Sequence, residues 1–214
     1  MKYHLEMIKN STMPQLHKDL LIGTILGDSS LKAGKTGAYL RFDQGQVNKE
    51  YLYYLFSIMS VYCTQSEPTE RTYLDPRYNK EYRSYNFYTQ SSPIFYPFAE
   101  LFLDKSIKMG KVLKIVPLCI GDLLTPRALA FWLMDDGQYV KRGGITLCTD
   151  SFSMGEVLLL KSVLEEKYGL QCTIHNKNPE KGHYRIYISG KSLPVLRELV
   201  REFIHPSMAY KLGK

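Results

Sequence analysis

One pattern occurs twice in the 214-residue chain, about half a chain length apart, and it constrains the fold more than any other feature. The segment DLLIGTILGDSSL begins at Asp19, and the segment ALAFWLMDDGQYV begins at Ala128. Each is an apolar stretch of helical length that runs into an aspartate, Asp28 in the first copy and Asp136 in the second. A pattern repeated at this spacing predicts two related halves.

The segments that follow the two aspartates also match each other. Polar, glycine-containing sequence with short alternating strands comes first in both copies and predicts a hairpin. Amphipathic helices follow at 48–62 and 153–170, and then further hairpins with turns at 75–80 and 178–182. Each half ends in a helix with an early proline, a residue that is common in the first turn of helices.

The predicted fold is therefore α+β, with two pseudo-symmetric halves that each follow the order αββαββα. Each half is expected to form a four-stranded antiparallel sheet that is backed by helices on one face. We expect the halves to be residues 1–117 and 118–214. The segment VPLCIGDLLT at 116–125 is short and fairly apolar, so it predicts a shared interface and not a flexible linker.

Composition narrows the class of protein. The net charge of +7 points to a polyanionic partner, although a basic surface without such a partner would give the same balance. A transmembrane helix is not expected, because no apolar run approaches 18 residues, and the N-terminus lacks the apolar run of a secretory signal. The four cysteines are scattered, and the five histidines form no H-x-x-x-H pair. These patterns predict an intracellular, non-secreted protein with reduced thiols and no transition-metal site.

The acidic ends of the two apolar helices conflict with the partial negative charge of a helix C-terminus. If the helices pack side by side in the same direction, Asp28 and Asp136 converge, and a divalent cation would resolve the repulsion. Gly23 and Gly27 lie four residues apart and would let another backbone approach closely, which accounts for the cost of about 1 kcal/mol per glycine. For either motif alone, a core helix with a solvated acidic end is the alternative.

LIGTILGDS at 21–29 and LAFWLMDDG at 129–137 resemble the two copies of the LAGLIDADG motif. The resemblance is to single-chain, intron-encoded homing endonucleases of the yeast mitochondrial omega-intron type, and it spans about 18–214. The final segment IHPSMAYKLGK resembles the C-terminal lysine segment of these enzymes. Two positions depart from the motif: Ser29 replaces the last glycine, and Phe131 stands where the family has glycine, which implies asymmetric helix packing.

The resemblance implies a metal site at the eighth motif position, which is Asp28 in one copy and Asp136 in the other, with the backbone carbonyls of Gly27 and Asp135 beside it. It implies Mg²⁺ as the cofactor, with Mn²⁺ able to substitute and Ca²⁺ supporting binding without cleavage. Asp135 occupies the seventh position, which is usually small, and is expected to support the site or the helix without binding metal.

Phosphodiester hydrolysis needs an activated water and stabilisation of the charge that develops on the phosphate. The resemblance places two lysines, Lys114 and Lys211, beside the metals, each late in its own half. It also implies a water-holding polar group near the end of the second strand of each half, for which Gln46 and Asp150 are the candidates. Without the resemblance, these residues would be read as surface lysines and strand-end turn residues.

Basic residues recur in all four predicted hairpins, and an antiparallel ribbon fits the major groove of DNA. Tyr73, Tyr78, Tyr82 and Tyr85 interleave with them. The two sheets would then form a saddle on double-stranded DNA. The residues expected to contact DNA are Lys32, Lys35, Arg41, Arg71, Arg77, Lys80, Arg83, Lys141, Arg142, Lys177, Lys181 and Arg185.

These expectations describe a monomeric, site-specific endonuclease that cuts one phosphodiester in each DNA strand and leaves 3′ overhangs. Because the halves differ in sequence, the target should be long and not a perfect palindrome. Two alternatives stay open: an RNA-binding maturase that acts on its own intron RNA, and a DNA-binding regulator that does not cleave. A mitochondrion, a plastid or the prokaryotic cytoplasm would suit each of them.

Overall fold

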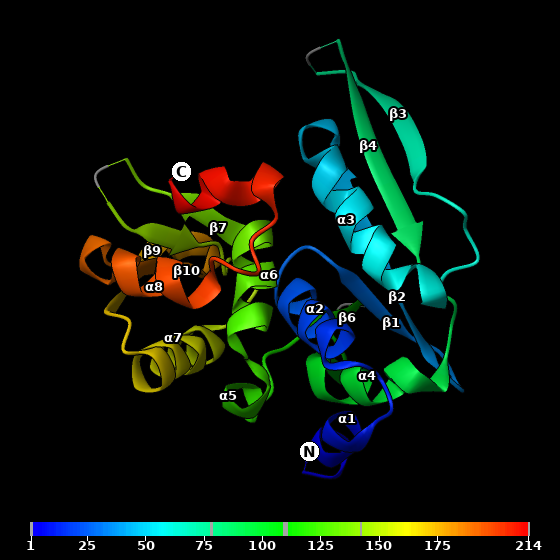
Figure 1. Cartoon of the computed structure of the whole chain (residues 1–214), viewed down its shortest axis with the longest axis horizontal. Coiled ribbons are helices and arrows are strands. Elements are labelled where there is room, and N and C mark those ends of the chain that lie inside the picture. The colour runs from blue at the N-terminus through cyan, green and yellow to red at the C-terminus, as the bar shows by residue number, and fades with distance from the viewer. Residues whose placement is uncertain (1, 78, 109–110, 142, 214) are drawn as a thin grey trace.

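The computed structural model describes residues 2–77, 79–108, 111–141 and 143–213. Two helices lie side by side at the centre, α2 (Gln15–Leu26) and α6 (Pro126–Asp136), with one half of the chain on either side of them (Figure 1). Every residue of 18–26 and of 128–135 is buried. A helix that is buried all round has no polar face, which explains why both motifs are apolar almost without interruption.

The first half forms a four-stranded antiparallel sheet in the order β1-β2-β4-β3. Helix α3 covers one face of this sheet, where the Phe42 and Phe87 rings stack with centroids 4.5 Å apart and Phe56 meets Phe87 edge-on. The elements in chain order are α1 (Lys2–Asn10), α2, β1 (Ser30–Ala33), β2 (Ala38–Gly45), α3 (Lys49–Met59), β3 (Thr69–Asp75), β4 (Lys80–Tyr88), α4 (Tyr96–Phe102), β5 (Leu103–Lys108) and β6 (Lys111–Lys114).

The second half repeats this sheet in the equivalent order β7-β8-β10-β9. Its covering helix begins at a capping box between Ser153 and Glu156 and ends at Gly169, whose φ of 64° suits glycine. The elements are α5 (Ile120–Leu123), α6, β7 (Gly137–Tyr139), β8 (Ile145–Leu147), α7 (Met154–Tyr168), β9 (Cys172–Asn178), β10 (His183–Ile188), α8 (Leu193–Val200) and the 3₁₀ helix η6 (Pro206–Leu212).

The predicted αββαββα order and the two antiparallel four-stranded sheets are confirmed, and both distal hairpins turn where the sequence indicated. Sequence reasoning missed the helices α1 and α5, the β5–β6 hairpin and the 3₁₀ character of η6. The expected division at 117/118 falls between β6 and α5. Among the described residues, no helix combines the length and apolarity needed to cross a membrane.

The close approach of α2 and α6 depends on two glycines. A Cβ atom on Gly23 would lie 2.3 Å from the carbonyl oxygen of Ala128 and 2.5 Å from Cβ of Phe131. A Cβ on Gly27 would lie 2.5 Å from both Cβ and Oδ2 of Asp135. Both glycines thus face the partner helix, as the spacing predicted. Phe131 packs directly opposite Gly23, so the contact is asymmetric.

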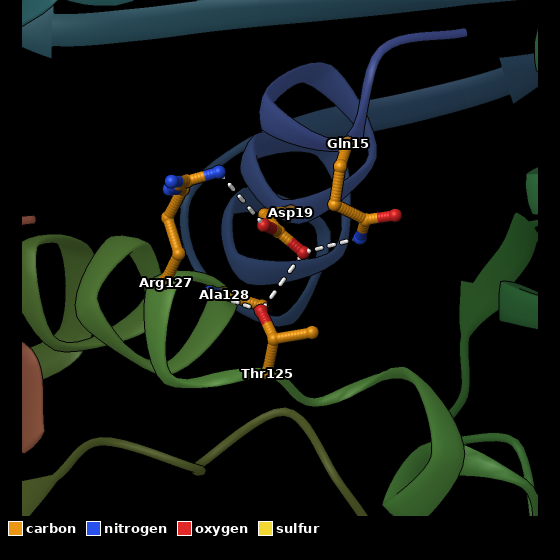
Figure 2. Close-up of polar contacts among 5 residues, drawn as sticks. All are labelled: Gln15, Asp19, Thr125, Arg127 and Ala128. Carbon is orange, nitrogen blue, oxygen red and sulfur yellow. Dashed lines mark hydrogen bonds and ion pairs between the residues drawn. The ribbon is translucent and has the colours of Figure 1, made fainter.

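At the opposite end of the helix pair, a buried carboxylate joins the two halves (Figure 2). Asp19 accepts hydrogen bonds from Gln15 Nε2 and Thr125 Oγ1, both at 2.8 Å, and pairs with Arg127 at 3.4 Å. Thr125 is the N-cap of α6, and its hydroxyl also accepts from the N–H of Ala128 at 3.1 Å. The start of α2 therefore lies at the start of α6, and the two helices run in the same direction.

Candidate active site and nucleic-acid interface

Three carboxylates meet where α2 and α6 end. Asp28 is exposed and follows α2, whereas Asp136 is half-buried at the last position of α6. The backbone N–H of Asp28 donates to Oδ2 of the buried Asp135 at 3.1 Å. Trp132 Nε1 donates to Oδ2 of Asp136 at 3.3 Å. The two motif aspartates converge, as the parallel packing of the helices requires.

The negative charge at this point is only partly compensated. Burial, and then the charge of Asp28, raise the pKa of Asp136 to about 7, although Lys114, Trp132 and Lys211 act in the opposite direction. Burial and Asp28 also raise the pKa of Asp135 well above its usual range. Carboxyl groups with raised pKa values at one point indicate a site that a cation would stabilise.

Each half places one lysine on the carbonyl that precedes its aspartate. Lys114 Nζ donates to the backbone oxygens of Gly27 at 2.6 Å, Ile25 at 3.0 Å and Ser29 at 3.2 Å. Lys211 Nζ donates to the backbone oxygen of Asp135 at 3.0 Å. The two lysines thus occupy pseudo-equivalent positions, although β6 carries one and η6 the other.

The electrostatics of Lys114 follow from its surroundings. Burial lowers the pKa of its ammonium group, and the charges of Asp136, Asp135 and Asp28 counteract this effect. The three carbonyls that Lys114 contacts include orphan acceptors from the end of α2, because the last carbonyls of a helix have no intrahelical partner. Lys114 therefore both closes α2 and brings a positive charge to the acidic cluster.

The structure brings Gln44, and not Gln46, to the first aspartate. Gln44 Nε2 donates to Oδ2 of Asp28 at 3.0 Å, and Asn48 Nδ2 donates to Oε1 of Gln44 at 2.9 Å. Gln46 is exposed in the turn after β2. Strand β2 alternates between buried and half-buried residues, with Ala38 and Gln44 in the buried set. Extending that alternation along AYLRFDQ would have selected Gln44 from the sequence.

Asp150, the other candidate for holding water, forms an ion pair in the turn after β8. It accepts from Arg185 Nε at 2.9 Å and Nη2 at 2.5 Å, and this bonding lowers the pKa of Asp150. Arg185 also senses the charge of Asp136, which contributes to raising its pKa. Asp150 and Arg185 therefore lie in the part of the second half that is near Asp136, and Arg185 is already paired with the carboxylate of Asp150.

The face of the first sheet that α3 leaves open is basic and aromatic. Arg71 Nη2 donates to the hydroxyl of Tyr88 at 3.0 Å, and the guanidinium carbon of Arg41 lies 5.6 Å from the centroid of that ring. Tyr73 and Tyr82 stack with centroids 5.7 Å apart towards the tip of the β3–β4 hairpin. This hairpin projects well beyond the rest of the sheet (Figure 1). We call this surface the first open face.

Several other predicted DNA contacts differ from that arrangement. Arg83 lies on the opposite side of β4, where it is 3.9 Å from Glu70 and 3.6 Å from Glu81. The Tyr85 ring is buried, and its hydroxyl donates to Glu70 at 2.7 Å. Lys80, by contrast, lies on the first open face with Nζ 5.4 Å from the Tyr82 ring centroid, and Arg77 pairs with Asp75 in the turn. Lys32, Lys35, Lys141, Lys177 and Lys181 are exposed as well, whereas Arg142 and Tyr78 lie outside the described residues.

The corresponding face of the second sheet carries a row of neutral polar residues that sequence reasoning missed. Gln138, Thr146, Tyr187 and Thr173 are aligned across four neighbouring strands. His175 stacks on Tyr187 with centroids 5.1 Å apart. In β10, the buried Ile186 and Ile188 alternate with half-buried residues, which places the row on the face of the sheet that points away from α7. Only the residue-by-residue register could have revealed it. We call this surface the second open face.

Two pseudo-symmetric sheets, joined through parallel helices that end in converging aspartates, make up the fold of a DNA endonuclease. The sequence profile of the LAGLIDADG DNA endonuclease family matches residues 18–196. The chain belongs to this family, and the resemblance seen in its two motifs is confirmed.

Individual relatives agree. The DNA endonuclease I-ChuI of Chlamydomonas applanata is 32% identical over 210 residues, covering 94% of this chain and 96% of that protein. The cytochrome b mRNA maturase bI2 of Saccharomyces cerevisiae is 33% identical over 199 residues, covering 91% of this chain but 46% of the maturase. The homing endonuclease I-WcaI, solved on its DNA recognition sequence, superposes with a TM-score of 0.84 at 27% identity, covering 99% of this chain and 91% of that one.

Proposed function

We propose that this chain is a metal-dependent, site-specific endonuclease that hydrolyses one phosphodiester in each strand of a DNA duplex. The observation that carries the proposal is the convergence of Asp28 and Asp136, each with a lysine of its own half on the preceding carbonyl. Cutting two antiparallel strands calls for two related sets of groups, and the pseudo-symmetric halves supply one set each.

The residues at the centre fit a hard divalent cation such as Mg²⁺. Asp28 and Asp136 would hold it, with the second lone pairs of the Gly27 and Asp135 carbonyls in reach. Among the residues that the structure describes, no three His, Cys, Asp or Glu side chains are arranged around a metal position. Phosphate oxygens and water would therefore complete the coordination, so that binding of metal and of DNA are coupled. Mn²⁺ should substitute, and Ca²⁺ should support binding without cleavage.

The bound metal would supply Lewis-acid stabilisation of the reacting phosphate. The chain's own groups have separate roles. Lys114 and Lys211 bring positive charge to the site where negative charge develops. Gln44 orients the carboxylate of Asp28 through the bond to Oδ2. Asp150 remains a candidate for holding water in the second half, whereas the exposed Gln46 is better suited to contact DNA.

The substrate follows from the two open faces. Both carry polar side chains at strand spacing, and an antiparallel ribbon fits the major groove. Because the faces differ residue by residue, the target should be long and asymmetric. We propose that the chain acts as a monomer, leaves 3′ overhangs, and works in a compartment with introns, whether mitochondrial, plastid or prokaryotic.

Selection from a library of random duplexes tests this function directly. Duplexes retained by the protein in Ca²⁺ would be recovered, transferred to Mg²⁺ and sequenced at the cut ends. One long recurring site with staggered 3′ ends is the expected result. Asp28→Asn and Asp136→Asn should bind the site without cutting it, whereas Asp122→Asn, in the exposed part of α5, should cut normally. Retention without cutting by the wild-type chain would identify a regulator.

A second candidate function is supported by the bI2 maturase relative. The same open faces could bind the structured RNA of an intron that encodes this chain. Filter binding with that intron RNA and with a scrambled RNA of equal length would separate the two functions. Selective, salt-resistant retention of the intron RNA by a chain that cuts no duplex would favour the maturase.

A further inference from the structure

The hydrogen bond between Asp28 and Asp135 crosses from one half of the molecule to the other. Its donor is the backbone N–H of Asp28, and its acceptor is Oδ2 of Asp135, 3.1 Å away and 107 residues later in the chain. The bond therefore attaches the backbone of one metal-site aspartate to a side chain that belongs to the other half.

The end of α2 leaves this N–H without a helical partner. Gly27 N–H donates to Gly23 O at 3.1 Å, and Ser29 N–H donates to Thr24 O at 2.9 Å. Thr24 O is the acceptor that a continuing helix would offer to Asp28. Because α2 stops at Leu26, the Asp28 amide needs a partner from elsewhere, and Asp135 provides it.

The second half has no equivalent bond. The position before Asp28 that corresponds to Asp135 is Gly27, which has no side chain to offer. Its place cannot be taken by a larger residue, since a Cβ there would lie 2.5 Å from Asp135. Asp136, moreover, is still part of α6 and is held by the helix itself. The support of the two aspartates is therefore unequal.

The acceptor is also tightly enclosed. Asp135 is 9% exposed, and the buried hydroxyl of Tyr51 lies in the same pocket, where it senses the charge of Asp135. The Tyr51 hydroxyl and Oδ1 of Asp135 are both buried, and a hydrogen-bond interaction between the two side chains contributes to the pKa shifts of both groups. The bond from the Asp28 N–H is the contact through which the Asp135 carboxyl group holds the backbone of that aspartate.

We infer that Asp135 is a positioning residue, which fixes Asp28 for cleavage of one DNA strand by holding its backbone from the opposite half. The inference rests on the proposed endonuclease function and goes beyond it, because it makes one strand cut depend on the seventh residue of the other motif. Loss of the bond should release Asp28 while Asp136 stays in place. The two strands would then be cut at unequal rates.

The test compares Asp135→Asn with Asp135→Leu. The two substitutes have the same branching, but only asparagine has an oxygen that accepts the Asp28 N–H. Single-turnover cleavage of a duplex labelled on each strand in turn gives the two rates separately. The Leu variant should slow one strand roughly tenfold more than the other, since small misplacements of reacting groups are costly. The Asn variant should keep the two rates in the wild-type ratio.

A second measurement needs no DNA and no metal. Hydrogen exchange of the Asp28 amide, followed by NMR, should be protected in wild type and in Asp135→Asn, and about tenfold faster in Asp135→Leu. Gln44→Ala should slow cleavage of the same strand that Asp135→Leu slows, because Gln44 also holds Asp28.

The outcomes are separable. Equal slowing of both strands in the Leu variant, or unchanged exchange of the Asp28 amide, would overturn the inference. If Asp135→Leu fails to fold, Asp135→Ala replaces it in both measurements. A wild-type chain that cuts no duplex would contradict the proposed function, and the exchange data would still decide whether Asp135 holds Asp28.

Discussion

The two halves share one topology but present different surfaces to a partner. The first open face combines Arg41 on β2 with Arg71 and stacked tyrosines on a hairpin whose strands are 7 and 9 residues long, and Arg41 pairs with Asp43. On the second, the hairpin strands are 7 and 6 residues long, neutral polar residues are aligned across the sheet, and Arg185 pairs with Asp150. The comparison teaches that the shared strand order fixes where exposed side chains lie, whereas the residues at those positions give each face its own charge and hydrogen-bonding pattern.

The two motif aspartates, Asp28 and Asp136, also occupy equivalent positions but have different surroundings. Asp28 lies beyond the end of its helix and depends on Gln44, Asp135 and a lysine with three carbonyl partners nearby. Asp136 lies within α6 and accepts a hydrogen bond from Trp132. The carbonyl before it, that of Asp135, accepts one hydrogen bond from Lys211. The first site is held by more bonds, so single substitutions should affect it more.

The largest expected effect concerns the two lysines. Lys114→Met should reduce cleavage more than Lys211→Met, because it also leaves three carbonyls without their donor. Losing one charge-stabilising donor costs about 10²–10³-fold in rate, and Lys114→Met should reach the upper end. Single-turnover kinetics at saturating protein measure both. Equal losses would show that the lysines are equivalent despite their different surroundings.

The second largest effect should come from disturbing the close contact between α2 and α6. Gly23→Ala forces a Cβ against Ala128 O, so the free energy of unfolding should fall by about 1–3 kcal/mol, as for other overpacked cores. Gly155→Ala in α7 is the matched control, because open space surrounds that position and alanine suits a helix. Urea unfolding gives both values. A Gly23→Ala protein as stable as the control would exclude the tight contact.

A smaller effect should separate the open faces. Arg71→Ala should weaken binding to all duplexes and reduce the salt slope of log K by about 1, as expected for a lost phosphate contact. Thr173→Ala should change sequence preference and leave that slope unchanged. Fluorescence anisotropy across a salt series measures both. Arg83→Ala, on the covered side of β4, serves as the control, and a reduced slope there would reverse the assignment of faces.

The smallest effect concerns the ion pair of the second half. Asp150→Asn should free Arg185 for DNA and strengthen duplex binding by less than about 1 kcal/mol, since the pair is partly exposed. The same anisotropy titration at low salt measures the change. Weaker binding would mean that the carboxylate itself contacts the duplex or a metal.

Much of this architecture was predictable because the sequence states it twice. The repeated pattern predicted the two halves, the order of helices and strands along the chain, and the convergence of Asp28 and Asp136. The details that the sequence did not reveal depend on strand register and on contacts between residues far apart in the chain. Gln44 was missed because the sequence alone does not show which polar residue near the end of β2 turns towards Asp28, and the side of β4 that Arg83 occupies follows from the strand register. Asp19 was missed because its partners in the other half, Thr125 and Arg127, lie more than 100 residues away at the start of α6.

The all-round burial of α2 and α6 has a consequence for how such a protein can change. Residues 18–26 and 128–135 of the central pair are buried where the two halves meet, while each open face belongs to one half alone. Substitutions can therefore accumulate on one sheet without disturbing the other sheet or the cleavage centre between them. Under the proposed function, a change in the DNA target could be followed one half-site at a time, and recognition surfaces from different relatives could be exchanged across an unaltered pair of helices.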